Sequence, residues 1–459
     1  MPLRRRALWA FAIIACLALL LAPALWNGFP LLQYDTGGYL APWFDHRLAV
    51  NRPVPYGLLL VAGQWLDFWP VLVVQSALTI WVLGLMLRAH KLGGRPMLLL
   101  GLIAALSVFT TLPWLTAILL TDIFAGLAIL ALYLLLLRDE GLRKGERAGL
   151  MVLTIFGAAT HSGTLVLLIG LTAAAALVRL VALARFPLER IWRAVAALAF
   201  SAIFVLTLNG SVTGTLGWAP GGYALSFGRM LQDGIVHKYL DRHCPDASLK
   251  LCPYKNMLPR DPDDFFWGGG IFNTLGRFEG LHEEMRRIAL ASLAEYPWLQ
   301  LRSVVGETAK QLVMVDTGAG VVSWVWDTYF TIKDHVPAAL PAMHAARQQR
   351  GTLSFVAINW LDVPFAYLTM ALLPVLVLLT WSRRGWSDIG ELAATAGFAI
   401  LGNAAVFGLL ATAHNRYGAR TVWLAALAVF LALARWGNER ISAKRPSRAP
   451  RLGRRRKLK

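Results

Sequence analysis

The chain has 459 residues, of which 57% are hydrophobic and 15% charged, and its formal net charge is +19. Soluble domains carry about 25% charged residues, and several apolar runs approach the ~20 residues that cross a bilayer as a helix. A single soluble domain is therefore excluded. We predict an all-α polytopic membrane protein, because lipid satisfies no free backbone groups and these runs are too long for barrel strands.

Ten apolar runs follow one another along the chain. The first resembles a signal peptide that ends at Ala22-Pro23-Ala24, but many spans follow it, so we interpret it as a retained helix. A shorter stretch, 54–66, carries prolines and is predicted to lie as a helix at the outer surface. The predicted spans are residues 7–26, 70–88, 96–112, 118–137, 148–160, 164–184, 194–208, 353–381, 391–413 and 421–436.

Basic residues gather on one side of these spans, as the positive-inside rule describes. This pattern predicts a bacterial inner-membrane protein with both termini in the cytoplasm. It also argues against a nucleic-acid partner, and it makes membrane lipids the expected contact of the basic tail, 437–459. The groups are Arg4 to Arg6; Arg88, Lys91 and Arg95; Arg138, Arg143, Lys144 and Arg147; Arg185, Arg190 and Arg193; and Arg383 with Arg384.

One large hydrophilic region, 209–352, lies between predicted helices 7 and 8, on the external (periplasmic) side. Residues 283–302 have a helical pattern there, and entry of 312–326 into the membrane is left open. Cys244 and Cys252 lie in this region, where a disulfide is permitted; two free thiols are the alternative. The predicted domains are a transmembrane module, 1–208, with its first outer loop at 27–69, then the periplasmic region 209–352, the helices 353–436 and the tail.

The first outer loop contains the densest set of polar groups, in the stretch 33–57. Asp35 is followed by Gly37 and Gly38, which allow a backbone to bend close to a ligand. Tyr39, Arg52 and Tyr56 follow. The stretch predicts a carboxylate held at the mouth of a membrane bundle, and an ordinary polar loop is the alternative.

The predicted topology places further polar groups on this same face. Asp122 starts a span near its outer end, although an acid there also fits a helix N-terminus. His161 lies in an outer turn, where a plain polar turn residue is the alternative. The last outer loop adds Asn415, Arg416, Tyr417 and Arg420. Ionisable groups within or beside spans are costly and usually functional.

The sequence lacks the motifs of zinc proteases, serine hydrolases and P-loop ATPases, and it has no metal-spaced Cys/His cluster. The candidate functional groups that remain are carboxylates and arginines. A carboxylate can accept a proton from a hydroxyl nucleophile, and an arginine can hold a departing phosphate through two hydrogen bonds. Together they provide the chemistry needed to move a sugar from a lipid phosphate to an alcohol.

Three short motifs resemble those of the GT-C membrane glycosyltransferases, which include protein O-mannosyltransferases and the aminoarabinose transferase acting on lipid A. YDTGGYL with RPVPYGLLL is similar to their first loop. TDIFAGL, which contains Asp122, is similar to their second acidic motif, and NRYGARTVWL, which contains Arg416, to their late arginine segment. Thr36 stands where many members have a second acid, and the arginine segment lacks the usual following Leu-Pro.

The resemblance implies a GT-C-like fold and a polyprenyl-phosphate sugar as donor, with a lipid, glycan or protein hydroxyl as acceptor. Asp35 would be the general base, and Asp122 a second catalytic residue that positions the acceptor or a divalent cation. Arg416 and Arg420 would contact the phosphate, and a divalent cation beside Asp122 is left open. The remaining predicted substrate-binding residues are Tyr39, Arg52, Tyr56, His161, Asn415 and Tyr417. A transporter or flippase of a lipid-linked substrate, a polysaccharide polymerase or ligase, and a non-catalytic assembly protein are the alternatives.

Overall fold

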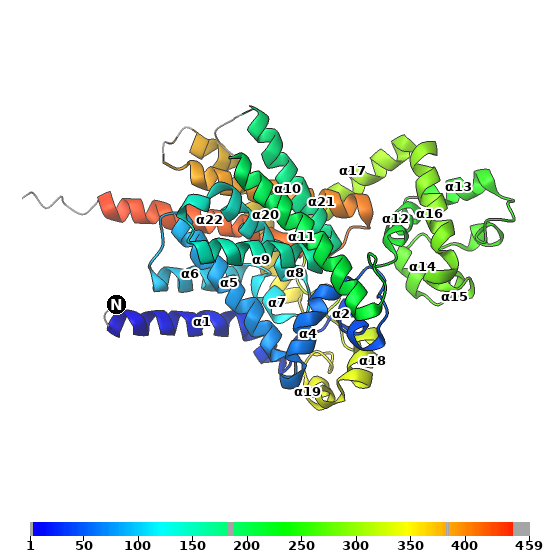
Figure 1. The fold of residues 1–459 in the computed structure, drawn as a ribbon, viewed down its shortest axis with the longest axis horizontal. Coiled ribbons are helices and arrows are strands. Elements are labelled where there is room, and N and C mark those ends of the chain that lie inside the picture. The colour runs from blue at the N-terminus through cyan, green and yellow to red at the C-terminus, as the bar shows by residue number, and fades with distance from the viewer. Residues whose placement is uncertain (1–2, 182–186, 382, 384, 444–459) are drawn as a thin grey trace, which may run out of the picture.

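The computed structural model of the protein describes residues 3–181, 187–381, 383 and 385–443. Within these ranges the regular structure is helical, with two isolated β-bridges and no β-strand (Figure 1). The predicted all-helical fold class is therefore confirmed for this part of the chain. The end of the predicted basic tail, 444–459, and the arginines Arg185 and Arg384 lie outside the described residues.

Seven helices of the described chain are long and apolar enough to cross a membrane. The other three predicted spans fall on α6 (Pro96–Phe109), α8 (Asp122–Leu137) and α9 (Lys144–Thr160), which have 14, 16 and 17 residues. At about 1.5 Å per residue these are shorter than a hydrocarbon core of ~30 Å. A count of ten spans thus stays a prediction. The seven are α1 (Leu3–Asn27), α5 (Trp69–Ala89), α10 (Ser162–Val181), α11 (Leu188–Thr213), α20 (Val356–Trp381), α21 (Ser387–Leu410) and α22 (Asn415–Ala443).

The interior of the bundle is formed by α8 and α22. Nearly every residue of α8 is buried, and 78% of the apolar window of α22 is buried, against 28% for α1 and 22% for α20. Helices that are apolar all round but exposed, as α1 and α20 are, suit a lipid environment. The interior helices therefore hold their end residues in fixed positions relative to the rest of the bundle.

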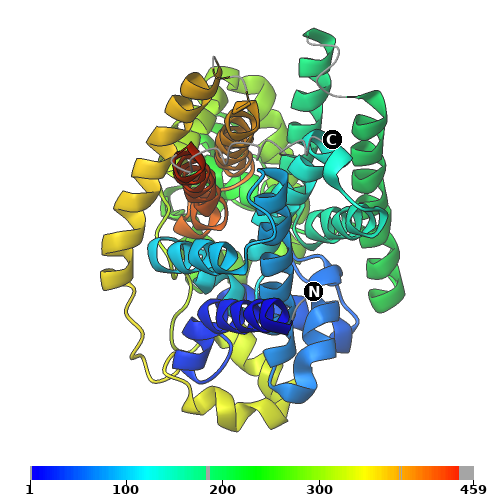
Figure 2. The same ribbon diagram turned by 90° about the vertical axis from the view of Figure 1, so that its left-hand side faces the viewer.

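The bundle has two distinct ends (Figures 1 and 2). At the basic end, α1 begins and α22 ends, and the short connections between helices pair their charges. Asp139, in η3 (Asp139–Gly141), accepts from Arg147 Nε at 2.6 Å and from Arg193 Nη1 at 3.1 Å. The opposite end, called the Asp35 end below, carries the first loop and the large insertion.

The first loop folds into short helices, α2 (Tyr34–Leu40), α3 (Pro42–Asp45), η1 (Val54–Tyr56), α4 (Gly57–Gly63) and η2 (Gln64–Leu66). The expectation that Gly37 and Gly38 bend the backbone is wrong, because both lie inside α2. A Cβ on Gly37 would lie 2.7 Å from the Cα of Thr328 in α18 (Trp326–His335). A Cβ on Gly38 would lie 2.4 Å from Cδ of Arg52. The glycines instead allow close packing around Asp35.

The insertion between α11 and α20 begins with a subdomain that has its own hydrophobic cluster and projects from the bundle (Figure 1). A disulfide joins Cys244 and Cys252 within it, with the two Cα atoms 5.5 Å apart. Its helices are α12 (Gly222–Gln232), α13 (Ile235–His243), η4 (Cys252–Met257), α14 (Pro262–Trp267), α15 (Ile271–Thr274) and α16 (Arg277–Glu295).

The chain then returns to the bundle through α17 (Pro297–Val313), which packs along α21. The helical pattern expected over 283–302 is confirmed except at Tyr296, where α16 ends before Pro297 starts α17. Residues 314–325 contain no helix and lie between α17 and α18. The insertion ends with η5 (Pro337–Ala339) and α19 (Leu340–Ala345).

Candidate functional site

Asp35 lies between two arginines at the Asp35 end. Its Oδ1 accepts a hydrogen bond from Arg52 Nη2 and its Oδ2 accepts one from Arg416 Nη1. The side chain of Gln33 caps α2 by accepting from the Asp35 amide at 2.7 Å. The carboxylate is 22% exposed, so its charge is compensated by the two guanidiniums more than by water.

Arg416 also reaches the second predicted acid. Its Nε donates to Asp122 Oδ2 at 2.7 Å, so one guanidinium bridges the two carboxylates. Asp122 lies in the first turn of α8 after the N-cap residue Thr121, and no side-chain cap bond forms there. Asp122 is therefore held by an ion pair rather than by a capping hydrogen bond.

Several polar atoms at this site are buried and have no hydrogen-bond partner. Arg420, one helical turn after Arg416, is fully buried; its Nε donates to Asn403 Oδ1 at 3.0 Å, and its guanidinium carbon lies 4.6 Å from the Phe407 ring centroid. Buried polar atoms are nearly always satisfied by protein, water or ligand. The unpartnered atoms are Arg52 Nε, Asp122 Oδ1, Arg416 Nη2 and both Nη atoms of Arg420. We call Asp35, Arg52, Asp122, Arg416 and Arg420 the Asp35 cluster.

The electrostatics make Asp35 a weak base in this arrangement. Burial raises the pKa of its carboxyl, but the charges and hydrogen bonds of Arg52 and Arg416 outweigh burial and hold the pKa below its usual range. The same contact with Asp35 raises the pKa of Arg52 against the opposing effect of burial. Asp35 is thus a fixed anion at neutral pH whose oxygens are both engaged.

A narrow pocket with a volume of about 40 Å³ opens beside the cluster. Its polar lining residues reach it from separate segments and are Gln33, Thr111, Asp122, Asp316, Thr317 and Arg416. The apolar wall includes Leu31, Trp114, Leu115, Ile118, Val321 and Phe355, of which Trp114 and Leu115 belong to α7 (Leu112–Ala117). An apolar cleft with a few convergent polar groups is the usual form of a ligand site.

The predicted tyrosines take packing positions. The hydroxyl of Tyr39 lies 3.5 Å from Thr121 Oγ1, and burial raises the pKa of Tyr39 to about 12. Tyr56 packs edge-on against the Tyr39 ring, with 5.4 Å between centroids, and donates to Gln75 Oε1. Tyr417 stacks on Phe407 at 3.7 Å. None of these tyrosines lines the pocket.

His161 and Asn415 lie around the cluster. His161 Nδ1 accepts from the Gly163 amide at 3.0 Å. Burial, and then the charge of Arg420, hold the pKa of His161 well below its usual range, so the ring is neutral. Asn415 Oδ1 accepts from the Asp316 amide at 3.2 Å. Asn415 thus ties the segment after α17 to the start of α22.

Asp316 was missed by the sequence interpretation, because it lies in a segment without helical periodicity. A signal was present: the tripeptide Asp-Thr-Gly occurs twice, at residues 35–37 and 316–318. In the structure both copies flank Arg416, one through the Asp35 ion pair and the other through the hydrogen bond to Asn415.

The residues present do not fit a divalent cation. Among the described residues no three His, Cys, Asp or Glu side chains form a metal-binding group. The two nearest carboxylates, Asp35 and Asp122, already share the guanidinium of Arg416. A cation between them would have to displace that arginine, so no step is derived through a metal.

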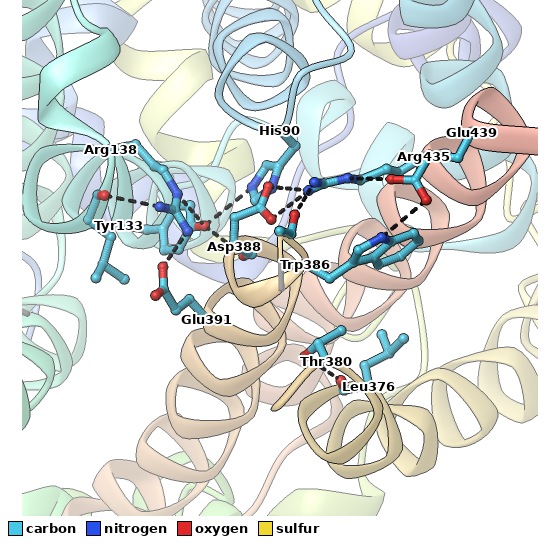
Figure 3. A network of polar contacts seen from close by, with 12 residues as sticks. His90, Tyr133, Arg138, Leu376, Thr380, Trp386, Asp388, Glu391, Arg435 and Glu439 are labelled. Carbon is cyan, nitrogen blue, oxygen red and sulfur yellow. Dashed lines mark hydrogen bonds and ion pairs between the residues drawn. The ribbon is translucent and has the colours of Figure 1, made fainter. Parts of the chain in front are cut away.

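A second arginine network lies at the basic end (Figure 3). Arg435 Nη1 donates to both oxygens of Asp388, whose Oδ2 also lies 3.1 Å from His90 Nδ1. The Tyr133 hydroxyl lies 3.3 Å from His90 Nε2, and Arg138 Nε donates to it at 3.2 Å. No side-chain polar atom of these five residues is buried without a partner. We call these residues the Asp388 network.

The part of the chain that the structure describes is all-helical, with seven helices able to span a membrane and a buried arginine–carboxylate cluster beside an apolar pocket. Comparisons with protein-family models, with curated proteins and with solved structures found no match. The likeness to GT-C glycosyltransferases therefore rests on the three sequence motifs.

Proposed function

We propose that this chain is a membrane-embedded glycosyltransferase that moves a sugar from a polyprenyl phosphate to a hydroxyl acceptor. One observation supports this most directly: unpartnered donors of Arg416 and Arg420 and an unpartnered oxygen of Asp122 occur together at the Asp35 end. An anion can accept from the arginine donors, and a hydroxyl can donate to the carboxylate oxygen. A sugar phosphate has both.

The arginines are suited to the phosphate. Arg416 and Arg420 lie four residues apart on α22 and so share one helix face. Planar guanidiniums bind phosphate oxygens in pairs, and these two retain free N–H groups. As the sugar leaves, charge builds on the phosphate oxygen, and fixed cationic donors stabilise that charge. Arg52 adds a third guanidinium through its contact with Asp35.

The pocket beside the cluster offers apolar contacts to the rest of the donor. Its apolar wall of α7 and the segments around Leu31, Val321 and Phe355 suits the first isoprene units. Asp122 Oδ1 is the acceptor available to a sugar hydroxyl. Arg416 and Asp122 are therefore expected to bind the donor as a pair. Arg416 Nε already donates to Asp122 Oδ2 at 2.7 Å.

The proposal includes the location and topology expected from the sequence. We place ten spans in a bacterial inner membrane, with the basic end and both termini in the cytoplasm and the Asp35 end in the periplasm. Reporter fusions after Arg143 and after Ala247 test this placement. Cytoplasmic signal at Arg143 and periplasmic signal at Ala247 are expected, and the reverse pattern would place the site on the wrong face.

A transporter or flippase uses the same polar groups as part of a path between the two faces. Between the two ends, however, α8 is packed with apolar side chains, and Ile123 to Leu136 are all buried. The polar groups of the two ends are thus separated by a continuous apolar core. This arrangement favours chemistry at one face over passage between them.

Sugar transfer by the purified protein tests the proposal. The protein in lipid vesicles is given polyprenyl phosphates carrying radiolabelled hexoses or pentoses, with an envelope extract as the source of acceptors, with and without divalent cation. Time-dependent transfer of label from at least one donor into the extract is expected. If no donor loses its sugar, and undecaprenyl phosphate does not raise the unfolding temperature, the proposal fails.

A further inference from the structure

We propose that Asp316 is the general base that deprotonates the acceptor hydroxyl, an inference that rests on the proposed glycosyl transfer. Asp316 lines the pocket together with Asp122 and Arg416, whereas Asp35 does not line it. A general base must lie within hydrogen-bond reach of the hydroxyl it activates. Of the two aspartates in the repeated Asp-Thr-Gly tripeptide, Asp316 is therefore the one placed for this contact.

The two aspartates differ in the availability of their oxygens. Both oxygens of Asp35 accept from guanidiniums. The Asp316 carboxylate has no hydrogen bond or ion pair in the described chain, and its oxygens are not among the buried unpartnered atoms, so they are accessible. An engaged carboxylate must break an ion pair before it can take a proton. Asp316 has no such requirement.

Contacts on both sides fix the backbone that carries Asp316. Its amide donates to Asn415 Oδ1 at 3.2 Å, which ties it to the first residue of α22. The next amide, of Thr317, donates to Asn359 Oδ1 at 2.7 Å, and the Thr317 hydroxyl donates to Asp362 Oδ2 at 2.9 Å. Asn359 and Asp362 belong to α20. The base is thus positioned from two membrane helices, next to Arg416.

The step balances with these groups alone. The acceptor oxygen forms a bond to the anomeric carbon of the donor, and the bond from that carbon to the phosphate oxygen breaks. The bonding electrons go to the phosphate, which leaves against Arg416 and Arg420. The hydroxyl proton passes to the Asp316 carboxylate, which later releases it to water. Asp35 remains the counter-ion that orients Arg52 and Arg416.

Kinetics of matched aspartate variants test this assignment, using the donor that the wild-type protein consumes. Asp316→Asn is expected to lower kcat by a factor of about 10² to 10⁴, the usual contribution of a general base, with the donor KM changed only a few-fold. Asp35→Asn is expected to act mainly on the donor KM. Asp334→Asn, an exposed acid in α18 outside the pocket, is the control and should behave as wild type.

Chemical rescue separates a base from a structural residue. Asp316→Ala is expected to regain turnover when formate is added, because a free carboxylate can enter the space and take the proton, whereas Asp35→Ala should not respond. Turnover of the same variant is compared with and without formate, so the result does not depend on how much of the protein folds. Wild-type kcat in Asp316→Asn, or a loss that formate does not restore, would overturn the assignment. Absence of transfer by the wild-type protein would instead refute the proposed function.

Discussion

The two ends of α22 each carry a buried arginine–aspartate cluster, and these clusters differ in how completely their polar atoms are satisfied. Arg416 opens this helix and Arg435 lies ~28 Å further along at about 1.5 Å per residue. In the Asp388 network each polar side-chain atom that is buried has a partner, whereas the Asp35 cluster leaves guanidinium and carboxylate atoms unpaired. Both clusters contain arginines and aspartates, so composition does not distinguish them. They differ in whether their buried polar atoms have hydrogen-bond partners.

Satisfied and unsatisfied clusters have different physical roles. A buried ion pair with complete hydrogen bonding holds helices in register, and removing one partner leaves an uncompensated charge. The Asp388 network joins α5, α8, α21 and α22 in this way. Unpaired buried donors beside a pocket are instead atoms that a bound ligand or water is expected to satisfy. Mutations in the Asp388 network should therefore change stability, and mutations in the Asp35 cluster should change turnover.

The largest expected effect is on stability, in Asp388→Ala. Removing this acid leaves Arg435 buried without its partner, which should lower the free energy of unfolding by ~3–5 kcal/mol. Turnover per folded molecule should stay at the wild-type value, because the network lies at the basic end. Thermal unfolding in detergent measures the first quantity, and transfer normalised to folded protein the second. Asp334→Ala is the control. A selective loss of turnover would contradict the structural role of this network.

Arg416→Lys should show the opposite pattern. Lysine keeps the charge but loses the planar fork that contacts Asp35 and Asp122 together. Loss of a fixed donor to a developing oxyanion typically lowers kcat about 10²- to 10³-fold. Arg435→Lys, on the same helix, is the matched control and should lower the unfolding temperature with little change in turnover. Equal turnover losses in both variants would remove the distinction between the two ends.

Gly37→Ala tests how the Asp35 cluster is positioned. A Cβ here meets the Thr328 backbone at 2.7 Å, and backbone cannot yield as a flexible side chain does, so α2 must shift away from α18. Overpacking of this kind costs about 1–3 kcal/mol, and turnover should fall because Asp35 moves with α2. Gly84→Ala in α5 is the control, since nothing lies within 4 Å of its added Cβ. Unchanged unfolding and turnover in Gly37→Ala would show that α2 is not held by this contact.

Part of this organisation could be predicted from the sequence. Hydropathy and the basic loops indicate helices and the side on which each helix ends. They predict that Asp35, Asp122 and Arg416 lie on one face, and in the structure Arg416 pairs with both aspartates. Which atoms pair could not be predicted, because that depends on packing between distant segments. Gly37 shows this, since its neighbour Thr328 comes from the insertion.

The remaining errors have physical causes. Helices α6 and α8 are shorter than the predicted spans. The apolar residues Ile118 to Leu120 before α8 are not helical, and Thr110 and Thr111 end α6 before Leu112 starts α7. The segment of Asp316 has no periodicity that hydropathy can detect. The Asp388 network could not be predicted either, because hydropathy places Arg435 inside the last span, 421–436, and gives no sign that Asp388 contacts it.

The smallest expected effect is a pH dependence that belongs to Asp35 alone. Its folded-state pKa lies below the usual value, so its ion pairs with Arg52 and Arg416 stabilise the protein at neutral pH. That stabilisation is lost as the pH falls below the unfolded value of about 3.9 toward the folded pKa. The unfolding temperature of Asp35→Asn should therefore be lower than that of the wild-type protein at pH 7, and the difference should shrink between pH 5 and pH 3. A difference that stays constant down to pH 3 would mean that the two arginines do not depend on the charge of Asp35.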